Sequence, residues 1–445
     1  MEDLLKKLIK NREEGSYPFH MPGHKRRTSK LPKELPYGFD ITEIDGFDDL
    51  HHAEGILRSY MEHAADVFGC DRLWYLVNGS TAGNLAAISA VAEYGDTIIV
   101  ARNCHKSVYN AIFLRGLKPV WIYPDEVEEF GIHGAMRPYE VETALMEHPD
   151  AKAVFLTSPT YEGIVSNVEK IAAICHKKNV PLLIDEAHGA HFGFHPAFPD
   201  SAIHLGADLV INSVHKTLPS LTQTAILKYK AHGGLIDLKQ VERYLSIYQS
   251  SSPSYILMAS IDCCVHMVEK GCGLFDPYVD KMMHFYNAIG KELHCLKIMD
   301  RRETGSWDLS KVVIMAPDLC VDGETLSEIF RADYHLEMEM AGPVYTLAMT
   351  SYLDEEEGID RLEEALLDLD RRLAEDAQAV LAPYERKEER LDESWIDALA
   401  GTVSDEFVYV YPPGIPVLAP GERCTEEIVK QLHQYVKDGL AIHRK

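Results

Sequence analysis

A lysine and an aspartate, each just beyond an apolar segment expected to form a buried strand, are the residues best placed for covalent chemistry. The segment Leu182–Ile184 ends at Asp185, and the segment 209–212 leads to Lys216. Ligands of open α/β sheets bind beyond the carboxyl ends of the strands, so both side chains are placed to meet one. A partly desolvated lysine there can form a Schiff base. Taken alone, Asp185 fits a helix cap equally well, and lone surface lysines are common.

Residues suited to a phosphate and to a flat ring follow other expected strands. The small residues 78–83, with Ser80 and Thr81 among them, lead from a strand into a helix, whose N-terminus can bind phosphate. Ser213 and His215 add a hydroxyl and an imidazole beside the lysine. His105 follows the strand 97–101 and has a ring that can stack on an aromatic cofactor and move a proton. Each feature alone also fits an ordinary N-cap or a structural histidine.

Together these groups predict a pyridoxal phosphate (PLP) site. A phosphate cradle, an acid for the ring nitrogen, a stacking imidazole and a nucleophilic lysine would all lie at strand ends of one sheet. Lys216, His105 and Asp185 are the expected catalytic residues. No metal site is expected, since the nine cysteines lack zinc-ligand spacing.

The elements that must position these residues alternate between strands and helices. Short apolar strands separated by helices predict an α/β fold whose mainly parallel sheet is covered on both faces. The block 236–297 is expected to be mostly helical, and strands at 311–315 and 344–349 with a helix at 354–372 indicate a smaller α+β domain. We predict an N-terminal arm at 1–55, a PLP-binding large domain at 56–297 and a C-terminal small domain at 298–445. The expected strands of the large sheet are 73–77, 97–101, 119–123, 151–156, 181–184, 208–212 and 224–228.

Length and charge narrow the function classes. A chain of 445 residues exceeds what one hydrophobic core usually serves, so more than one domain is expected. The formal net charge of −26, with no basic patch, disfavours nucleic acid and anionic membranes as partners. The sequence shows neither a signal peptide nor an apolar run long enough to span a bilayer, so we expect a cytoplasmic protein with reduced cysteines.

Motifs along nearly the whole chain resemble the fold-type-I ornithine/lysine/arginine (Orn/Lys/Arg) decarboxylase family. This resemblance implies the aspartate-aminotransferase-like PLP fold, with a seven-stranded sheet in the large domain. The motifs are His20-Met21-Pro22-Gly23-His24-Lys25, Asn78-Gly79-Ser80-Thr81-Ala82-Gly83, Arg102-Asn103-Cys104-His105-Lys106-Ser107, Ser158-Pro159-Thr160-Tyr161, Asp185-Glu186-Ala187-His188-Gly189, Ser213-Val214-His215-Lys216, Ser252-Pro253-Ser254-Tyr255 and Tyr411-Pro412-Pro413-Gly414-Ile415-Pro416.

The resemblance assigns a role to each matching position. Lys216 would carry PLP as a Schiff base, and Asp185 would hold the proton on its ring nitrogen. His105 would stack on one ring face with Ala187 on the other, and His188 would lie near the cofactor or substrate. The residues expected to hold the phosphate are Ser80, Thr81, Ser213 and His215, with Ser252 reaching the cofactor of a neighbouring subunit.

The implied activity is decarboxylation of arginine, lysine or ornithine to an amine that serves as a polyamine precursor. The chain begins at the arm, which corresponds to a short form of the family without the N-terminal wing domain. A homodimer or a dimer of dimers, with active sites at the subunit interface, is therefore expected.

Some positions depart from the family pattern and leave the substrate open. They are Ala101, Glu162, Ile211 and Pro219. We interpret Glu162 as a solvated acid, with a changed selectivity residue as the alternative. Candidate anchors for the end of the substrate side chain, each more readily structural, are Glu43, Asp45 and Glu406.

Other functions remain as alternatives. An aminotransferase needs an arginine clamp for the substrate carboxylate, and Arg386 or Arg390 could serve, although they lie in a charged run typical of a solvated helix. An aldolase and a catalytically silent paralogue are further alternatives. A PLP-binding transcription regulator is disfavoured because no basic helix-turn-helix segment precedes the domain.

Overall fold

A seven-stranded sheet forms the centre of the computed structural model, which describes residues 3–14, 17–300, 306–319, 321–354, 356–384, 394–410, 415–437 and 442–444. The strands lie in the order β1-β9-β8-β7-β6-β2-β3. Their bounds are β1 (Arg72–Leu76), β2 (Thr97–Ala101), β3 (Lys118–Ile122), β6 (Val154–Thr157), β7 (Leu182–Asp185), β8 (Leu209–Asn212) and β9 (Ala225–Tyr229).

The strands β8, β7, β6, β2 and β3 are mutually parallel, whereas β9 pairs antiparallel with both β1 and β8. Every residue of β7 and β8 is buried, which is why these strands are continuous apolar runs rather than alternating ones. The predicted mainly parallel sheet of seven strands is confirmed.

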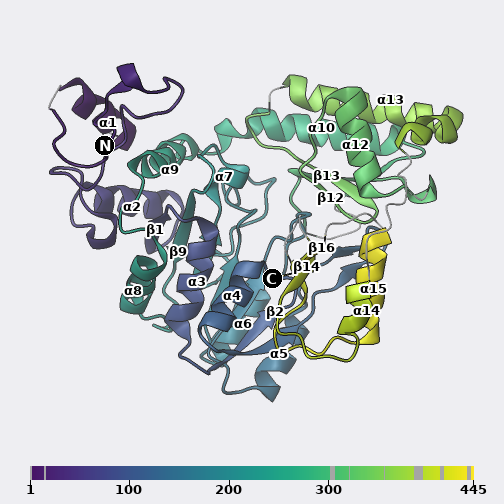
Figure 1. The fold of residues 1–445 in the computed structure, drawn as a ribbon, viewed down its shortest axis with the longest axis horizontal. Coiled ribbons are helices and arrows are strands. Elements are labelled where there is room, and N and C mark those ends of the chain that lie inside the picture. The colour runs from purple at the N-terminus through teal and green to yellow at the C-terminus, as the bar shows by residue number, and fades with distance from the viewer. Residues whose placement is uncertain are drawn as a thin grey trace.

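Helices pack on the large sheet (Figure 1). The helix α3 contacts β1, β7, β8 and β9. It can lie this close because residue 83 is glycine: a Cβ there would come within 2.8 Å of Leu76 and 2.9 Å of Ile211. The helices of this part are α2 (Ile56–Val67), α3 (Gly79–Val91), α4 (Lys106–Leu114), α5 (Pro138–Glu147), α6 (Val168–Lys177), α7 (Val214–Thr217), α8 (Leu238–Tyr248), α9 (Tyr255–Val268) and α10 (Asp276–Glu292).

The chain beyond β9 adds two smaller sheets. The first has the order β10-β11-β13-β12, is antiparallel, and lies with α12 and α13 at the upper right of Figure 1. The second has the order β15-β14-β16 and has its own small core with α14 and α15. The elements are β10 (Lys297–Ile298), β11 (Lys311–Met315), α12 (Gly323–Tyr334), β12 (Met340–Ala341), β13 (Tyr345–Met349), α13 (Glu356–Leu381), α14 (Ser394–Leu399), β14 (Val408–Val410), β15 (Ile415–Leu418), α15 (Glu426–Lys437) and β16 (Ile442–Arg444).

The sequence predicts β11, β13 and the helix α13, but not the second small sheet. Arg102 joins that sheet to the large one, because its guanidinium donates to Val417 O at 3.0 Å and pairs with Glu422 at 3.0 Å. A short hairpin of β4 (Glu126–Val127) and β5 (Ile132–His133) also lies beyond the predicted elements. The boundaries at 55 and 297 stay predictions.

The N-terminal arm lies at the end of the molecule opposite α13 (Figure 1). Its helix α1 (Leu4–Glu13) packs on α9 through the buried Leu4 and Leu8, and Leu4 N donates to Asp262 at 2.8 Å. Further along, Phe19 is 91% exposed and Met21 is 65% exposed. Among the described helices, none has the length and apolar character needed to cross a membrane.

The glycine at the contact between α3 and the sheet gives a test of this packing. Gly83→Ala should lower the free energy of unfolding by about 1–3 kcal/mol, because the added methyl overpacks the contact with Leu76 and Ile211. Gly290→Ala, in α10 with no neighbour within 4 Å of a Cβ, should raise it by up to about 1 kcal/mol. Urea unfolding followed by circular dichroism measures both, and equal stability of the two variants would contradict the packing.

Candidate active site

A cavity of about 530 Å³ opens at the carboxyl ends of the central strands. The structure brings all nine predicted site residues to its wall. Glu339 and Met349, which the sequence did not single out, also line the cavity, and so does Ile415 from one of the family motifs. The nine predicted residues are Ser80, Thr81, His105, Asp185, Ala187, His188, Ser213, His215 and Lys216.

The start of α3 forms a cradle for an anion. The N-cap residue Asn78 makes no side-chain bond to the helix, and its Oδ1 accepts instead from Ser250 N at 3.1 Å. No side chain therefore caps the first turn, which disfavours the ordinary N-cap interpretation. Ser80 Oγ and Ser213 Oγ are 2.7 Å apart, so two hydroxyls from different elements meet at this helix end.

His215 approaches the same cradle from α7, the one-turn helix after β8. Its Nδ1 donates to Thr224 O at 2.7 Å, which leaves Nε2 as the ring nitrogen for a phosphate. Burial lowers the pKa of His215, whereas a phosphate dianion would favour its charged, donating form.

Asp185 holds a fixed carboxylate at the end of β7. It is 3% exposed, and its Oδ2 accepts from Asn84 Nδ2 at 2.8 Å while its Oδ1 accepts from Ala187 N at 3.1 Å. The bond from Ala187 N closes a turn just after β7, so Asp185 does cap the following segment, as the alternative interpretation expected. The carboxylate also lines the cavity, where it can pair with a protonated ring nitrogen.

His105 is held as a neutral ring. Its Nδ1 accepts from Ser107 N at 3.2 Å, which assigns the ring proton to Nε2. Burial lowers the pKa of His105 to about 4, although Asp185 acts in the opposite direction. A neutral, fixed imidazole in the cavity wall suits stacking on a cofactor ring.

Lys216 lies in the one-turn helix α7, with its Nζ 2.9 Å from His188 Nε2 and 5.6 Å from the ring centre of Tyr161. Burial lowers the pKa of Lys216, while Asp185 and Glu339 raise it. A lowered pKa increases the neutral fraction of the amine, the form that attacks an aldehyde.

The predicted interpretation of Glu162 as a solvated acid is wrong. Glu162 is 8% exposed, lines the cavity and accepts from Tyr345 OH at 2.7 Å. The tertiary contact with β13 buries it, and local sequence does not reveal such a contact. Tyr161 OH, on the neighbouring residue, donates to Glu339.

Asn84 and Lys311 are further residues that sequence reasoning missed. Asn84 lies one helical turn after Ser80, a spacing that places both on one face of α3 and could have revealed it. Lys311 begins β11, and a charge at a strand end gives no sign of burial. Its side chain contacts His188, a residue of the cavity wall.

Other predicted residues lie away from the cavity wall. Ser252 is exposed and does not line the cavity of its own chain, and neither do Glu43, Asp45 and Glu406. Glu406 binds Arg444 instead. The predicted clamp residues Arg386 and Arg390, and the motif residues 411–414, lie outside the described residues.

The donor set fits PLP. Hydroxyls and an imidazole meet at an uncapped helix end, a fixed carboxylate lies deeper in the cavity, a neutral flat ring forms part of the wall, and an amine faces the same space. The volume falls within the range of small-molecule sites.

Comparisons with known proteins identify relatives along nearly all of the chain. The family model described as Orn/Lys/Arg decarboxylase, major domain, matches residues 3–304, and the C-terminal domain of the same family matches 363–442. The chain is 34% identical to an arginine decarboxylase of Halalkalibacterium halodurans, covering 95% of this chain and 91% of the relative. It is 31% identical to an arginine decarboxylase of Bacillus subtilis, with coverages of 95% and 91%.

A solved structure shares the fold. The lysine decarboxylase LdcF of Francisella novicida superimposes with a TM-score of 0.84 over 99% of this chain and 79% of that chain, at 20% identity. This likeness confirms the predicted fold class, a PLP fold type I with a large α/β domain and a smaller C-terminal part.

The lowered pKa of His105 predicts how stability depends on pH. An unfolded histidine binds a proton near pH 6.5 and folded His105 only near pH 4, so the unfolded state holds more protons between these values. The free energy of unfolding should therefore fall as pH drops from 6.5 to 4, by up to about 1.4 kcal/mol per pH unit from this residue.

His105→Phe should show a smaller loss over the same interval, because phenylalanine does not titrate. Urea unfolding of both cofactor-free proteins at a series of pH values measures the difference. Parallel pH profiles would mean that His105 is not held neutral.

Proposed function

Since the chain belongs to the Orn/Lys/Arg decarboxylase family and is a PLP-dependent decarboxylase of a basic amino acid, we propose that its substrate is arginine. Relatives named arginine decarboxylase match over more than nine-tenths of both chains. Two carboxylates at the cavity, Glu162 and Glu339, suit a planar guanidinium that donates several hydrogen bonds.

The composition of the cavity wall favours loss of the substrate carboxylate over its retention. An aminotransferase keeps this carboxylate and needs a clamp, which an arginine typically provides. Among the described residues that line the cavity, none is an arginine. A silent paralogue is disfavoured because the lysine, the acid and the phosphate cradle are all in place.

The polar residues of the cavity wall would then bind the cofactor or move a proton. Ser80, Thr81 and Ser213 would bind the cofactor phosphate together with His215. PLP, when bound, supplies an electron sink that accepts the electron pair of the breaking bond to the carboxylate.

Asp185 would keep the ring nitrogen of the cofactor protonated, and Asn84 holds that carboxylate in place. His105, through its Nε2 proton, or Lys216 would return a proton to the substrate Cα after carbon dioxide leaves. The product would be the amine that corresponds to the substrate, a polyamine precursor.

We also propose that the chain acts as a homodimer, or a dimer of dimers, in the cytoplasm. The exposed Phe19 and Met21 on the arm suit burial against a second subunit. Ser252 is exposed away from the cavity of its own chain, as a residue directed to a partner's cofactor would be. The described cysteines are all free thiols, which suits a reducing compartment.

Substrate preference gives the direct test. Purified protein with PLP, incubated separately with arginine, lysine and ornithine, should release carbon dioxide and amine with a kcat/KM roughly tenfold or more higher for arginine. Lys216→Ala should abolish turnover. A higher kcat/KM for lysine or ornithine would overturn the proposed substrate, and an amine-free keto acid product would indicate transamination.

The role of Glu339 is tested by removing its charge. Glu339→Gln should raise the KM for arginine roughly tenfold or more, because the negative charge that pairs with the guanidinium is lost, with a smaller change in kcat. Glu337→Gln is the matched control, because Glu337 is an exposed acid two residues earlier in the same segment. Equal KM values in the two variants would contradict a role in substrate binding.

A further inference from the structure

Lys311 is a fully buried lysine next to the candidate active site. It begins β11 in the first small sheet and is 0% exposed. Space for its stem comes from Gly163, where a Cβ would lie 2.7 Å from Lys311 Cγ, and the backbone of Gly163 has a φ of +97°. Burying an ammonium group costs free energy, so hydrogen-bond partners or an opposite charge must offset this cost.

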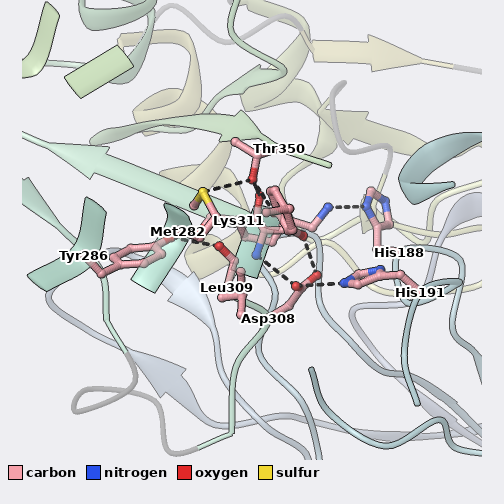
Figure 2. Close-up of polar contacts among 10 residues, drawn as sticks. His188, His191, Met282, Tyr286, Asp308, Leu309, Lys311 and Thr350 are labelled. Carbon is pink, nitrogen blue, oxygen red and sulfur yellow. Dashed lines mark hydrogen bonds and ion pairs between the residues drawn. The ribbon is translucent and has the colours of Figure 1, made fainter. Parts of the chain in front are cut away.

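Figure 2 shows those partners in one polar group of side chains. The Nζ of Lys311 lies 3.2 Å from His188 Nδ1. The nearby Asp308, also 0% exposed, binds His191 Nε2 at 3.0 Å, and Ser310 donates to it through its backbone N at 3.0 Å and its hydroxyl at 2.8 Å. Asp308 is thus a fixed negative charge beside Lys311.

His188 lies between two lysines, with Nδ1 facing Lys311 and Nε2 facing Lys216 at 2.9 Å. Burial lowers the pKa of His188 well below its ordinary value, and Lys216 and Lys311 lower it further, so the ring is neutral. A neutral imidazole has one N–H donor and one acceptor nitrogen. A cationic Lys311 can only donate, which makes Nδ1 the acceptor and places the proton on Nε2.

We propose that Lys311 is a positioning residue that fixes the Nε2–H tautomer of His188, so that His188 donates a hydrogen bond to the nitrogen of Lys216. This inference rests on the proposed function in one respect, that Lys216 is the residue which carries the cofactor. The contact reaches the active site from β11, so the first small sheet contributes to the chemistry without lining the cavity at this residue.

The tautomer preference should weaken at alkaline pH. Burial lowers the pKa of Lys311 to about 8, although Asp308 raises it. The other charged or titratable groups that act on Lys311 are Lys216, Glu339 and Glu162, together with His188. Above about pH 8 a neutral Lys311 can accept as well as donate, so neither tautomer of His188 is enforced.

Lys311→Met in the cofactor-loaded protein tests the proposal through the absorbance of the bound cofactor, without substrate. In the wild type, the cation of Lys311 and the N–H of His188 both disfavour protonation of the nitrogen that joins Lys216 to the cofactor. Lys311→Met should therefore move the pH midpoint of the absorbance change upward by about half a unit to one unit. Lys281→Met, with the same charge change on α10, should leave the midpoint unchanged.

A double-mutant cycle separates positioning through His188 from a merely structural effect. If Lys311 acts mainly through His188, Lys311→Met should shift the midpoint much less in a His188→Asn background than in the wild type. An equal shift in both backgrounds, or no shift in either, would overturn the proposal. A test at one pH would not distinguish these outcomes, so the full titration is required.

A measurement on the wild type covers the case in which Lys311→Met does not fold. The ¹⁵N chemical shifts of His188, assigned by their loss in His188→Asn, should show a protonated Nε2 and an unprotonated Nδ1 below pH 8. The reverse assignment would overturn the proposal. Failure of arginine turnover would overturn the proposed substrate alone, because neither spectroscopic test needs a substrate.

Discussion

The close packing of α3 on the large sheet is the contact on which the site depends. Because Gly83 has no side chain, the helix lies against Leu76 and Ile211. Asn84 then reaches the carboxylate of Asp185 at 2.8 Å, and the first turn of the same helix brings Ser80 to Ser213 at 2.7 Å. One helix thus sets the distance between Asp185, which we propose pairs with the cofactor ring, and the two serine hydroxyls, which we propose bind its phosphate.

Buried charge is the second constraint. The surroundings of the cavity hold Lys311 and the acids Glu162, Asp185 and Asp308 out of water, and their hydrogen-bond partners reduce the cost of this burial. Asp185 accepts two hydrogen bonds, and Asp308 accepts from a histidine and from Ser310. Burial keeps His105 and His188 neutral by lowering the pKa of each ring, which makes both oriented donors and acceptors. Such an arrangement is typical of a site that moves protons.

Much of the large domain could be predicted from the sequence. Its strands are short apolar runs that end in polar residues, and this local pattern located Asp185 and Lys216 at one edge of the sheet. The family resemblance then assigned roles to residues such as His188 and Ala187. All nine side chains that the sequence predicted for the cofactor site line one cavity.

What the sequence did not reveal depends on contacts between distant segments. Lys311 meets His188 across 123 residues of chain, and Glu162 is buried by Tyr345 across 183 residues. Local composition cannot tell a buried charge from a solvated one in such cases. The strands of the second small sheet, three or four residues each, are too short to show a period.

The attachment of the cofactor to Lys216 is the central claim, and borohydride reduction tests it most directly. Reduction of the PLP-loaded protein, followed by proteolysis and mass spectrometry, should place the reduced cofactor on the peptide that contains Lys216. Attachment to the nearby Lys311, to any other lysine, or to none would contradict this account of the site.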